Sequence, residues 1–338
     1  MKDINKLYQQ LLIPSEELIS EIATLDGDIL ILGVGGKMGP ALAKLAKHSI
    51  DEAGIKKIVI GVSRFSEPGL QDQLDQEGIK TYKADLLQDD QLKALPDVKN
   101  VIYMAGTKFG TSGKEPFTWA MNSYLPGRVA EKYRNSRIVV FSTGNVYHLT
   151  PVLSGGATED QSPQPVGEYA QSCLGRERLF QYFSSIYNIP TLIFRLNYAN
   201  DVSYGVLLDI ACSVKDNKPI DLSMGYVNVI WQGDANERAL RSLIHCQIPP
   251  KILNIAGPEI VSVRLVAEEF GRMFTLTPKF FNDEQSTALL SDAAESFRLF
   301  GYPKVPLKIM MNILAEWIKQ GGKILNKPTH FQERKGQF

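Results

Sequence analysis

The sequence is poor in the residues that build disulfide frameworks and metal sites. Its 338 residues include only three cysteines and four histidines, and both sets are scattered along the chain. An odd number of widely spaced cysteines argues against a disulfide framework and fits a reducing compartment. The histidines form no pair at helical spacing, so no metal site is predicted. We therefore expect a cytoplasmic protein without a structural metal.

Long apolar runs and an excess of charge of one sign are also absent. No stretch of 18 apolar residues occurs, and the N-terminus lacks the apolar core of a signal peptide, which argues against membrane insertion and export. Lysine and arginine balance aspartate and glutamate at 37 each, which gives a formal net charge of zero. Such a balance provides no general attraction for nucleic acid or an acidic membrane. Neither partner is predicted.

The remaining composition is ordinary for a globular enzyme. Apolar residues make up 44% of the chain and charged residues 22%, and no internal repeat or low-complexity tract is present. A chain of this length can bury a substantial core, in one large domain or in two closely joined domains.

A glycine-rich turn near the N-terminus is the most informative stretch. After Asp28, an apolar run over residues 29–32 leads into Gly33, Gly36 and Gly39, and an alanine- and leucine-rich segment follows directly. This order predicts a strand, a tight turn and a helix. The first glycine can adopt a positive φ, the second leaves room for a pyrophosphate, and the third lets the helix pack closely on the strand. The helix N-terminus would then bind the phosphates of a dinucleotide. An ordinary glycine-rich loop is the alternative.

Apolar runs and helical patterns alternate along the rest of the chain. Five further strands are predicted, over residues 57–62, 79–83, 100–104, 137–141 and 190–194. Strands that alternate with helices at this spacing indicate a doubly wound parallel sheet. Before the first strand, residues 4–24 are predicted to form amphipathic helices that are broken at Pro14, with Ser15 as the N-cap of the second helix.

The two residues after the second strand bear on the choice of cofactor. At this place a dinucleotide-binding fold meets the adenosine ribose, where a carboxylate binds the 2′-hydroxyl of NAD and an arginine suits the 2′-phosphate of NADP. The sequence has Ser63 and Arg64 here and no acidic residue. Lys37, inside the glycine turn, offers a second cation. The prediction is NADP with NAD as the alternative, unless Arg64 is simply a solvated surface residue.

Short motifs follow the later strands. Ala84-Asp85-Leu86 comes after the third strand, Ala105-Gly106 after the fourth, and Ser142-Thr143-x-x-Val146-Tyr147 at the fifth. The C-terminal third contains Val229-Ile-Trp-Gln-Gly-Asp234, Leu253-Asn-Ile-Ala-Gly257 and Leu299-Phe-Gly-Tyr-Pro303. Together with the glycine turn, these motifs resemble the extended short-chain dehydrogenase/reductase family, in its sugar epimerase/dehydratase branch, over about residues 27–320.

The resemblance implies a Rossmann-type α/β fold, a doubly wound parallel sheet with a smaller C-terminal substrate domain. The expected boundaries are 1–25 for an N-terminal helical extension, 26–197 with a return at 226–256 for the dinucleotide-binding domain, 198–225 and 257–325 for the substrate domain, and 326–338 for a polar tail that we expect to be partly ordered. The expected cofactor-binding residues are Gly33, Gly36, Lys37, Met38, Gly39, Ser63, Arg64, Asp85, Leu86, Ala105, Gly106 and Tyr169.

The catalytic motif of that family is incomplete in this sequence. The family uses a serine or threonine, a tyrosine as general acid and base, and a lysine four residues after the tyrosine that lowers the pKa of the tyrosine. Thr143 and Tyr169 match the first two positions and are the implied catalytic residues, but residue 173 is a cysteine. A neutral thiol does not stabilise a phenolate, and a thiolate would oppose it. No tyrosine of the chain has a lysine four residues later.

Three interpretations of this departure stay open. In the first, the site is inactive and the protein is a catalytically silent NAD(P)-binding sensor. In the second, another cation, such as Arg176 on the same helix face, assists Tyr169. In the third, the reaction needs no phenolate because the substrate supplies its own acidity. Cys173 itself is expected to be a small buried residue. Asn122 matches a family asparagine in a proton relay through the missing lysine, so a structural role is expected for it here.

The resemblance finally implies a function. It predicts an NAD(P)-dependent enzyme that oxidises, epimerises or dehydrates a sugar, a sugar acid or a sugar nucleotide, and the silent regulator is the alternative. The expected partner is a small sugar-type substrate, and a homodimer is an assembly that the sequence leaves open.

Overall fold

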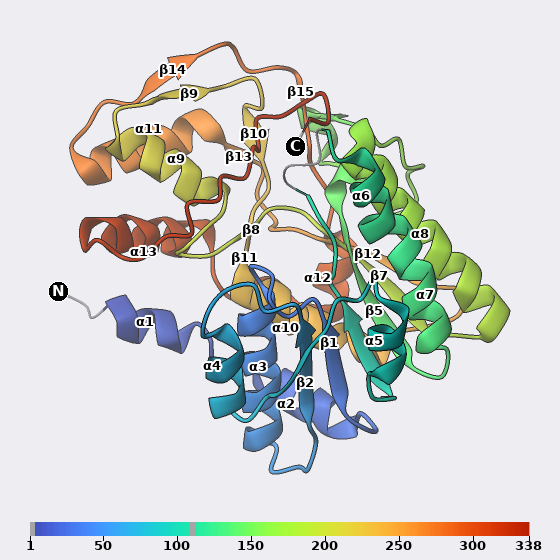
Figure 1. Ribbon diagram of the computed structural model, residues 1–338. Helices are drawn as coiled ribbons and strands as arrows, with labels where there is room; N and C mark the ends of the chain where they lie inside the picture. Colours follow the sequence, from blue (N-terminus) through green and yellow to red (C-terminus); the bar gives the residue numbers. More distant parts are fainter. Residues whose placement is uncertain (1–3, 109–112, 338) are drawn as a thin grey trace.

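A parallel sheet of seven strands forms the centre of the computed structural model, which describes residues 4–108 and 113–337 (Figure 1). The strand order is β12-β7-β5-β4-β1-β2-β3. The strands are β1 (Ile29–Leu32), β2 (Val59–Ser63), β3 (Lys80–Lys83), β4 (Asn100–Tyr103), β5 (Arg137–Thr143), β7 (Thr191–Leu196) and β12 (Lys251–Ile255). All six strands predicted up to residue 194 are present, which confirms the Rossmann-type α/β fold.

The order of the strands fixes where a ligand can bind. The chain runs outward from β1 through β2 to β3, and then returns to the other side of β1 to build β4, β5, β7 and β12. The order therefore reverses between β1 and β4. In open parallel sheets the crevice outside the carboxyl ends of the strands at such a reversal is the place where ligands bind.

The burial of β1 on both faces of the sheet accounts for its apolar sequence. Ile29 and Ile31 pack into the core on one face of the sheet, and Leu30 and Leu32 pack into the core on the other face. Alternate side chains of a strand point to opposite faces, so a strand that is covered on both faces must be apolar throughout.

Helices cover both faces of the sheet. On one face α2 (Glu16–Thr24), α3 (Gly39–Glu52) and α10 (Gln232–Arg241) pack against one another; on the other, α6 (Glu115–Trp119), α7 (Leu125–Lys132) and α8 (Gly167–Tyr187) do so (Figure 1). A π-helix over Ala120–Tyr124 joins α6 to α7. As predicted, Ser15 caps α2, because its Oγ accepts a hydrogen bond from Leu18 N at 3.0 Å.

A second group of elements, which we call the small lobe, has a hydrophobic core of its own. Its main helices are α9 (Val206–Lys215), α11 (Val263–Phe274) and α13 (Leu307–Lys319), with the strand pairs β9 (Pro219–Asp221) with β14 (Lys279–Phe281) and β10 (Tyr226–Val227) with β13 (Val261–Ser262). Figure 1 shows this lobe to one side of the sheet, with β8 (Ala199–Asn200) and β11 (Ile230–Trp231) between the two. The remaining named elements are α1 (Ile4–Gln10), α4 (Leu70–Gln76), α5 (Asp89–Ala94), β6 (Thr150–Pro151), β15 (Thr287–Ala288) and α12 (Ala294–Phe300).

The C-terminal segment (residues 321–337) is packed against the protein rather than partly ordered as the sequence suggested. Phe331 is 7% exposed and belongs to the core of the small lobe. Near the start of the segment, Nζ of Lys37 in the glycine turn donates a hydrogen bond to one of its carbonyls at 3.2 Å. Near its end, the main chain of Gly336 lies so close to Gly167 that a Cβ on Gly167 would collide with its carbonyl oxygen. The segment thus runs from the glycine turn across the small lobe to the start of α8.

Two classes of feature are absent from the part of the chain that the structure describes. No helix there is long and apolar enough to cross a bilayer. No group of three or more histidine, cysteine, aspartate or glutamate side chains is arranged there to hold a metal ion.

Candidate active site

The three glycines of the turn after β1 differ in how much space a side chain would have. Gly33 has a φ of +97°, and a Cβ on it would lie 2.7 Å from the main-chain nitrogen of Ala105. A Cβ on Gly39 would collide with the carbonyl group of Val34. A Cβ on Gly36 would meet only the carbonyl oxygen of Gly33, at 3.4 Å, which is an ordinary contact. The fold therefore needs glycine at 33 and 39, whereas Gly36 leaves an open surface at the N-terminus of α3.

The other predicted cofactor-binding residues surround this turn in different ways. Side chains of Met38 and Leu86 are buried in the two cores beside the sheet, so only their main chains can face a ligand. Asp85 accepts a hydrogen bond from Leu87 N at 3.1 Å. Arg64 is exposed directly after β2.

Lys37 behaves differently from the sequence expectation of a second cation near Arg64. Its ammonium donates to the carbonyl of Lys327, and it lies 5.1 Å from the centre of the Tyr204 ring. The structure directs this side chain toward the small lobe and the C-terminal segment. Arg64, and not Lys37, is therefore the candidate for binding a 2′-phosphate.

Thr143 and Tyr169 are brought together, as the sequence predicted. Thr143 is the last residue of β5, Tyr169 lies in the first turn of α8, and the Thr143 side chain is near enough to the phenol to lower its pKa. Burial and the neighbouring Cys173 raise the pKa of the Tyr169 phenol, while the nearby charge of Arg176 and the Thr143 hydroxyl act in the opposite direction. This pair can exchange a proton with a substrate hydroxyl group that comes within hydrogen-bond distance of the phenol.

Cys173 lies one turn along α8 from Tyr169 and is a buried neutral thiol. Its side chain is fully buried against Val146, Tyr147 and Ala157. Burial raises the pKa of the thiol. It is the small buried residue that the sequence led us to expect, and it supplies no positive charge.

A guanidinium from the same helix extends toward the ends of β4 and β5. In Arg176, Nη1 donates to the carbonyl of Phe141 at 2.7 Å and Nη2 donates to Oδ1 of Asn122 at 2.8 Å. A Cβ on Gly106 would lie 2.5 Å from this Nη2. The glycine that ends the Ala105-Gly106 motif therefore makes room for Arg176.

Lys108 is a site residue that the sequence reasoning missed. Its Nζ lies 5.6 Å from the centre of the Tyr169 ring, and burial, with the nearby charge of Lys37, lowers its pKa to about 8. The sequence signal for this site residue is its position, three residues after Ala105 in the loop that follows β4. Residues 109–112, which follow it, lie outside the described part of the chain.

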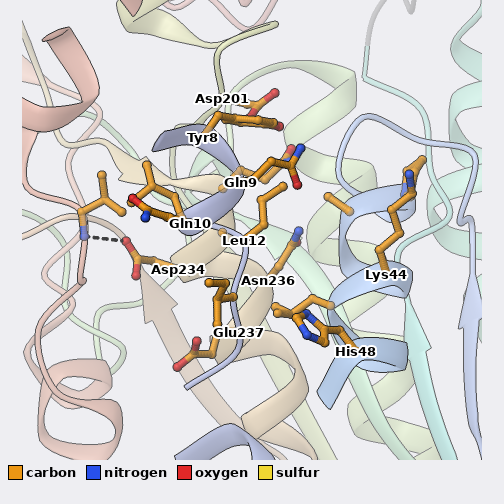
Figure 2. A pocket seen from close by; sticks show the side chains of 18 of the residues that line it. Tyr8, Gln9, Gln10, Leu12, Lys44, His48, Asp201, Asp234, Asn236 and Glu237 are labelled. Carbon is orange, nitrogen blue, oxygen red and sulfur yellow. Dashed lines mark hydrogen bonds between the residues drawn. The ribbon is translucent and has the colours of Figure 1, made fainter. Parts of the chain in front are cut away.

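A hollow of about 730 Å³ lies elsewhere, between the N-terminal segment, α3 and α10 (Figure 2). None of Thr143, Tyr169 and Arg176 lines it. Three of the polar residues labelled in Figure 2 have partners within the protein: the Tyr8 hydroxyl donates to Asp201 at 3.1 Å, and Asp234 accepts from two main-chain nitrogens. The chemistry is therefore expected at the strand ends and not in this hollow.

Comparison with known proteins identifies a family for this chain. The model of the NAD dependent epimerase/dehydratase family matches residues 29–207, which is more than half of the chain. Among curated proteins no sequence matches.

Several solved structures share the fold. UDP-glucuronic acid 4-epimerase from Bacillus cereus, in complex with UDP-glucuronic acid and NAD, is 19% identical over 87% of this chain and 99% of that chain, with a TM-score of 0.72. UDP-glucose 4-epimerase from Thermus thermophilus, in complex with NAD, is 16% identical over 86% and 99% of the two chains, with a TM-score of 0.71. The corresponding enzyme from Thermotoga maritima, with UDP-glucose, is 13% identical over 87% and 99%, with a TM-score of 0.70. From the match to its model over residues 29–207, the chain belongs to the NAD-dependent epimerase/dehydratase family.

Proposed function

We propose that the protein binds NAD(P) at the glycine turn and interconverts a sugar nucleotide, with Tyr169 as the general acid and base. The observation that carries this proposal is that Thr143, at the end of β5, and Tyr169, at the start of α8, lie together one strand away from the strand-order reversal. Structurally similar proteins hold UDP-sugars and NAD, which supports a sugar nucleotide over a free sugar.

The residues present fit a dinucleotide. Gly36 leaves its surface open where a pyrophosphate would approach the main chain, and the N-terminus of α3 provides unpaired N–H groups. When bound, the nicotinamide supplies a hydride acceptor and donor for the sugar carbon. The protein's own part is to hold the sugar hydroxyl against Tyr169, which accepts its proton and returns it.

The exposed arginine after β2 supports NADP as the preferred form of the cofactor. Arg64 offers a planar guanidinium that suits a 2′-phosphate, and no carboxylate stands beside it in the sequence to bind a 2′-hydroxyl. The NAD complexes of the similar structures support NAD as the alternative. A homodimer stays a prediction from the sequence.

The experiment is direct turnover. Purified protein would be incubated with NAD or NADP and with UDP-glucose or UDP-glucuronic acid, and the products would be resolved by chromatography and proton NMR. We expect an epimer of one substrate, and about a 100-fold or greater loss of rate in Tyr169→Phe. Cofactor binding without turnover of any sugar nucleotide would instead support the silent regulator, which the cysteine at 173 favours.

A further inference from the structure

Arg176 carries a buried charge on α8. It is 6% exposed, its two bonded nitrogens face neutral oxygens, and in the described part of the chain its Nε has no hydrogen-bond partner. Within the described ranges, no carboxylate forms a salt bridge with it. The adjacent Glu177 is hydrogen-bonded to Arg195 instead. Burying an unpaired charge is strongly unfavourable, so we expect this guanidinium to have a functional role that offsets the cost.

The position of Arg176 on α8 supplies that reason. Tyr169, Cys173 and Arg176 follow one another at i, i+4 and i+7, which places them on one face of the helix. The small Cys173 side chain leaves this face open, so the longer arginine can extend back along it toward Gly106. Burial alone would lower the pKa of Arg176, but Cys173, Tyr103 and Tyr169, together with the nearby carboxylate of Glu177, raise it above its ordinary value.

A chain of hydrogen bonds fixes the guanidinium relative to the tyrosine. Asn122 accepts from Arg176 with its Oδ1 and donates with its Nδ2 to Ser172 Oγ at 3.0 Å. Ser172 Oγ in turn donates to the carbonyl of Tyr169 at 2.8 Å. Asn122 also binds both main-chain groups of Thr107. The amide of Asn122 is therefore fully engaged in holding Arg176 in place.

We propose that Arg176 is the positioning residue whose fixed charge stabilises the Tyr169 phenolate, in the role that a lysine at 173 would otherwise have. The inference rests on the proposed function. In the step concerned, the O–H bond of the sugar hydroxyl breaks and its proton forms a new O–H bond on the Tyr169 phenolate. The electron pair of the broken bond stays on the sugar oxygen, so the negative charge passes from the phenol to that oxygen. Arg176 gains and loses no proton, and the phenolate is the anion that its buried charge lacks.

The first test follows the ionisation of Tyr169 without requiring turnover. Tyrosine labelled with ¹³C at Cζ would be incorporated, and the Tyr169 resonance would be assigned with Tyr169→Phe and titrated with pH. We expect Arg176→Met to raise the titration midpoint by about one to three pH units, and Arg176→Lys to stay closer to wild type. Arg178→Met, which removes an exposed arginine of the same helix, is the matched control and should not move the midpoint.

The second test moves the charge along the helix. In Cys173→Lys combined with Arg176→Met, one cation of α8 again faces Tyr169, with Lys108 from the loop after β4 unchanged beside the ring, and the midpoint should return to within about one pH unit of wild type. Cys173→Lys alone would place two cations on the same buried face of α8, in addition to Lys108, and should lower the thermal midpoint. If Arg176→Met does not fold, the double variant and Arg176→Lys carry the comparison, and both must fold and titrate near wild type.

The outcomes separate this inference from the proposed function. A Tyr169 midpoint that is the same in wild type and Arg176→Met, or a resonance that titrates in neither, overturns the role of Arg176. A raised midpoint together with no turnover of any sugar nucleotide would leave the role of Arg176 standing and remove the proposed reaction.

Discussion

Arg195 and Glu177 form a bidentate ion pair in the interior, next to the candidate active site. Nε and Nη2 of Arg195 donate to the two carboxylate oxygens of Glu177 at 3.0 and 2.6 Å, and both side chains are at most 1% exposed. Ser142 Oγ also donates to Glu177 at 2.5 Å, and Arg195 Nη1 donates to the Tyr147 hydroxyl at 2.6 Å. The pair therefore joins α8 to the carboxyl ends of β5 and β7, where Thr143 is held.

Removing the charge of Glu177 should destabilise the fold strongly. Glu177→Gln keeps the shape of the side chain but leaves Arg195 buried without a counterion, which costs about 3–5 kcal/mol. Urea denaturation would measure the free energy of unfolding. Glu316→Gln breaks the partly exposed pair with Lys319 and should cost about 1 kcal/mol or less. Equal losses in the two variants would contradict the importance of the buried pair.

Two glycines of the same turn should respond differently to substitution. Gly36→Val places methyl groups on the open surface and should abolish nucleotide binding while the circular dichroism spectrum stays unchanged. Gly39→Ala places a Cβ against the carbonyl of Val34 and should lower the thermal midpoint. Isothermal titration with NAD and NADP would compare the variants. Undiminished binding in Gly36→Val would mean that the dinucleotide lies elsewhere.

Arg64 should determine the preference between the two cofactors. If its guanidinium binds the 2′-phosphate, wild type binds NADP more tightly than NAD, and Arg64→Ala loses about tenfold or more for NADP with little change for NAD. The exposed Arg178→Met variant is a suitable control. An NADP preference that survives Arg64→Ala, or is absent from wild type, would show that this assignment is wrong.

Lys108 should react as an unusually nucleophilic lysine at mild pH. With a pKa of about 8, half of its side chains are neutral at pH 8, whereas under about 1% of ordinary lysine side chains are. Reductive methylation at pH 8, read by mass spectrometry, should modify Lys108 earlier than the exposed Lys218, whose pKa is raised by Asp216. The difference should shrink toward pH 10.5. A Lys108 that reacts no faster than Lys218 would contradict the lowered pKa.

The sequence was sufficient for the parts of this molecule that depend on local pattern. The apolar run before Gly33 predicted a strand that is present as β1, and the family resemblance implied Thr143 and Tyr169 as the catalytic residues, which the structure brings near each other. The surroundings of that pair depend on contacts that no local pattern encodes. The contact of Lys108 with Tyr169 depends on the path of a loop after β4. The packing of the C-terminal segment depends on tertiary contacts such as the burial of Phe331 in the core of the small lobe, within a polar stretch that has no periodicity.

The contacts of the C-terminal segment make its release from the rest of the protein measurable at one of its own amides. Its amides and carbonyls are bonded to groups on both sides of the site: Lys327 O accepts from Lys37, Thr329 N donates to Asp209, and Gly336 packs on Gly167. A motion that draws the small lobe and this segment away from the sheet has to break the contacts with Lys37 and Gly167, whereas release of the segment from α9 has to break the bond to Asp209. Hydrogen exchange at Thr329 N would therefore follow the release of the segment from the small lobe, and a ligand that holds the segment in place would slow that exchange.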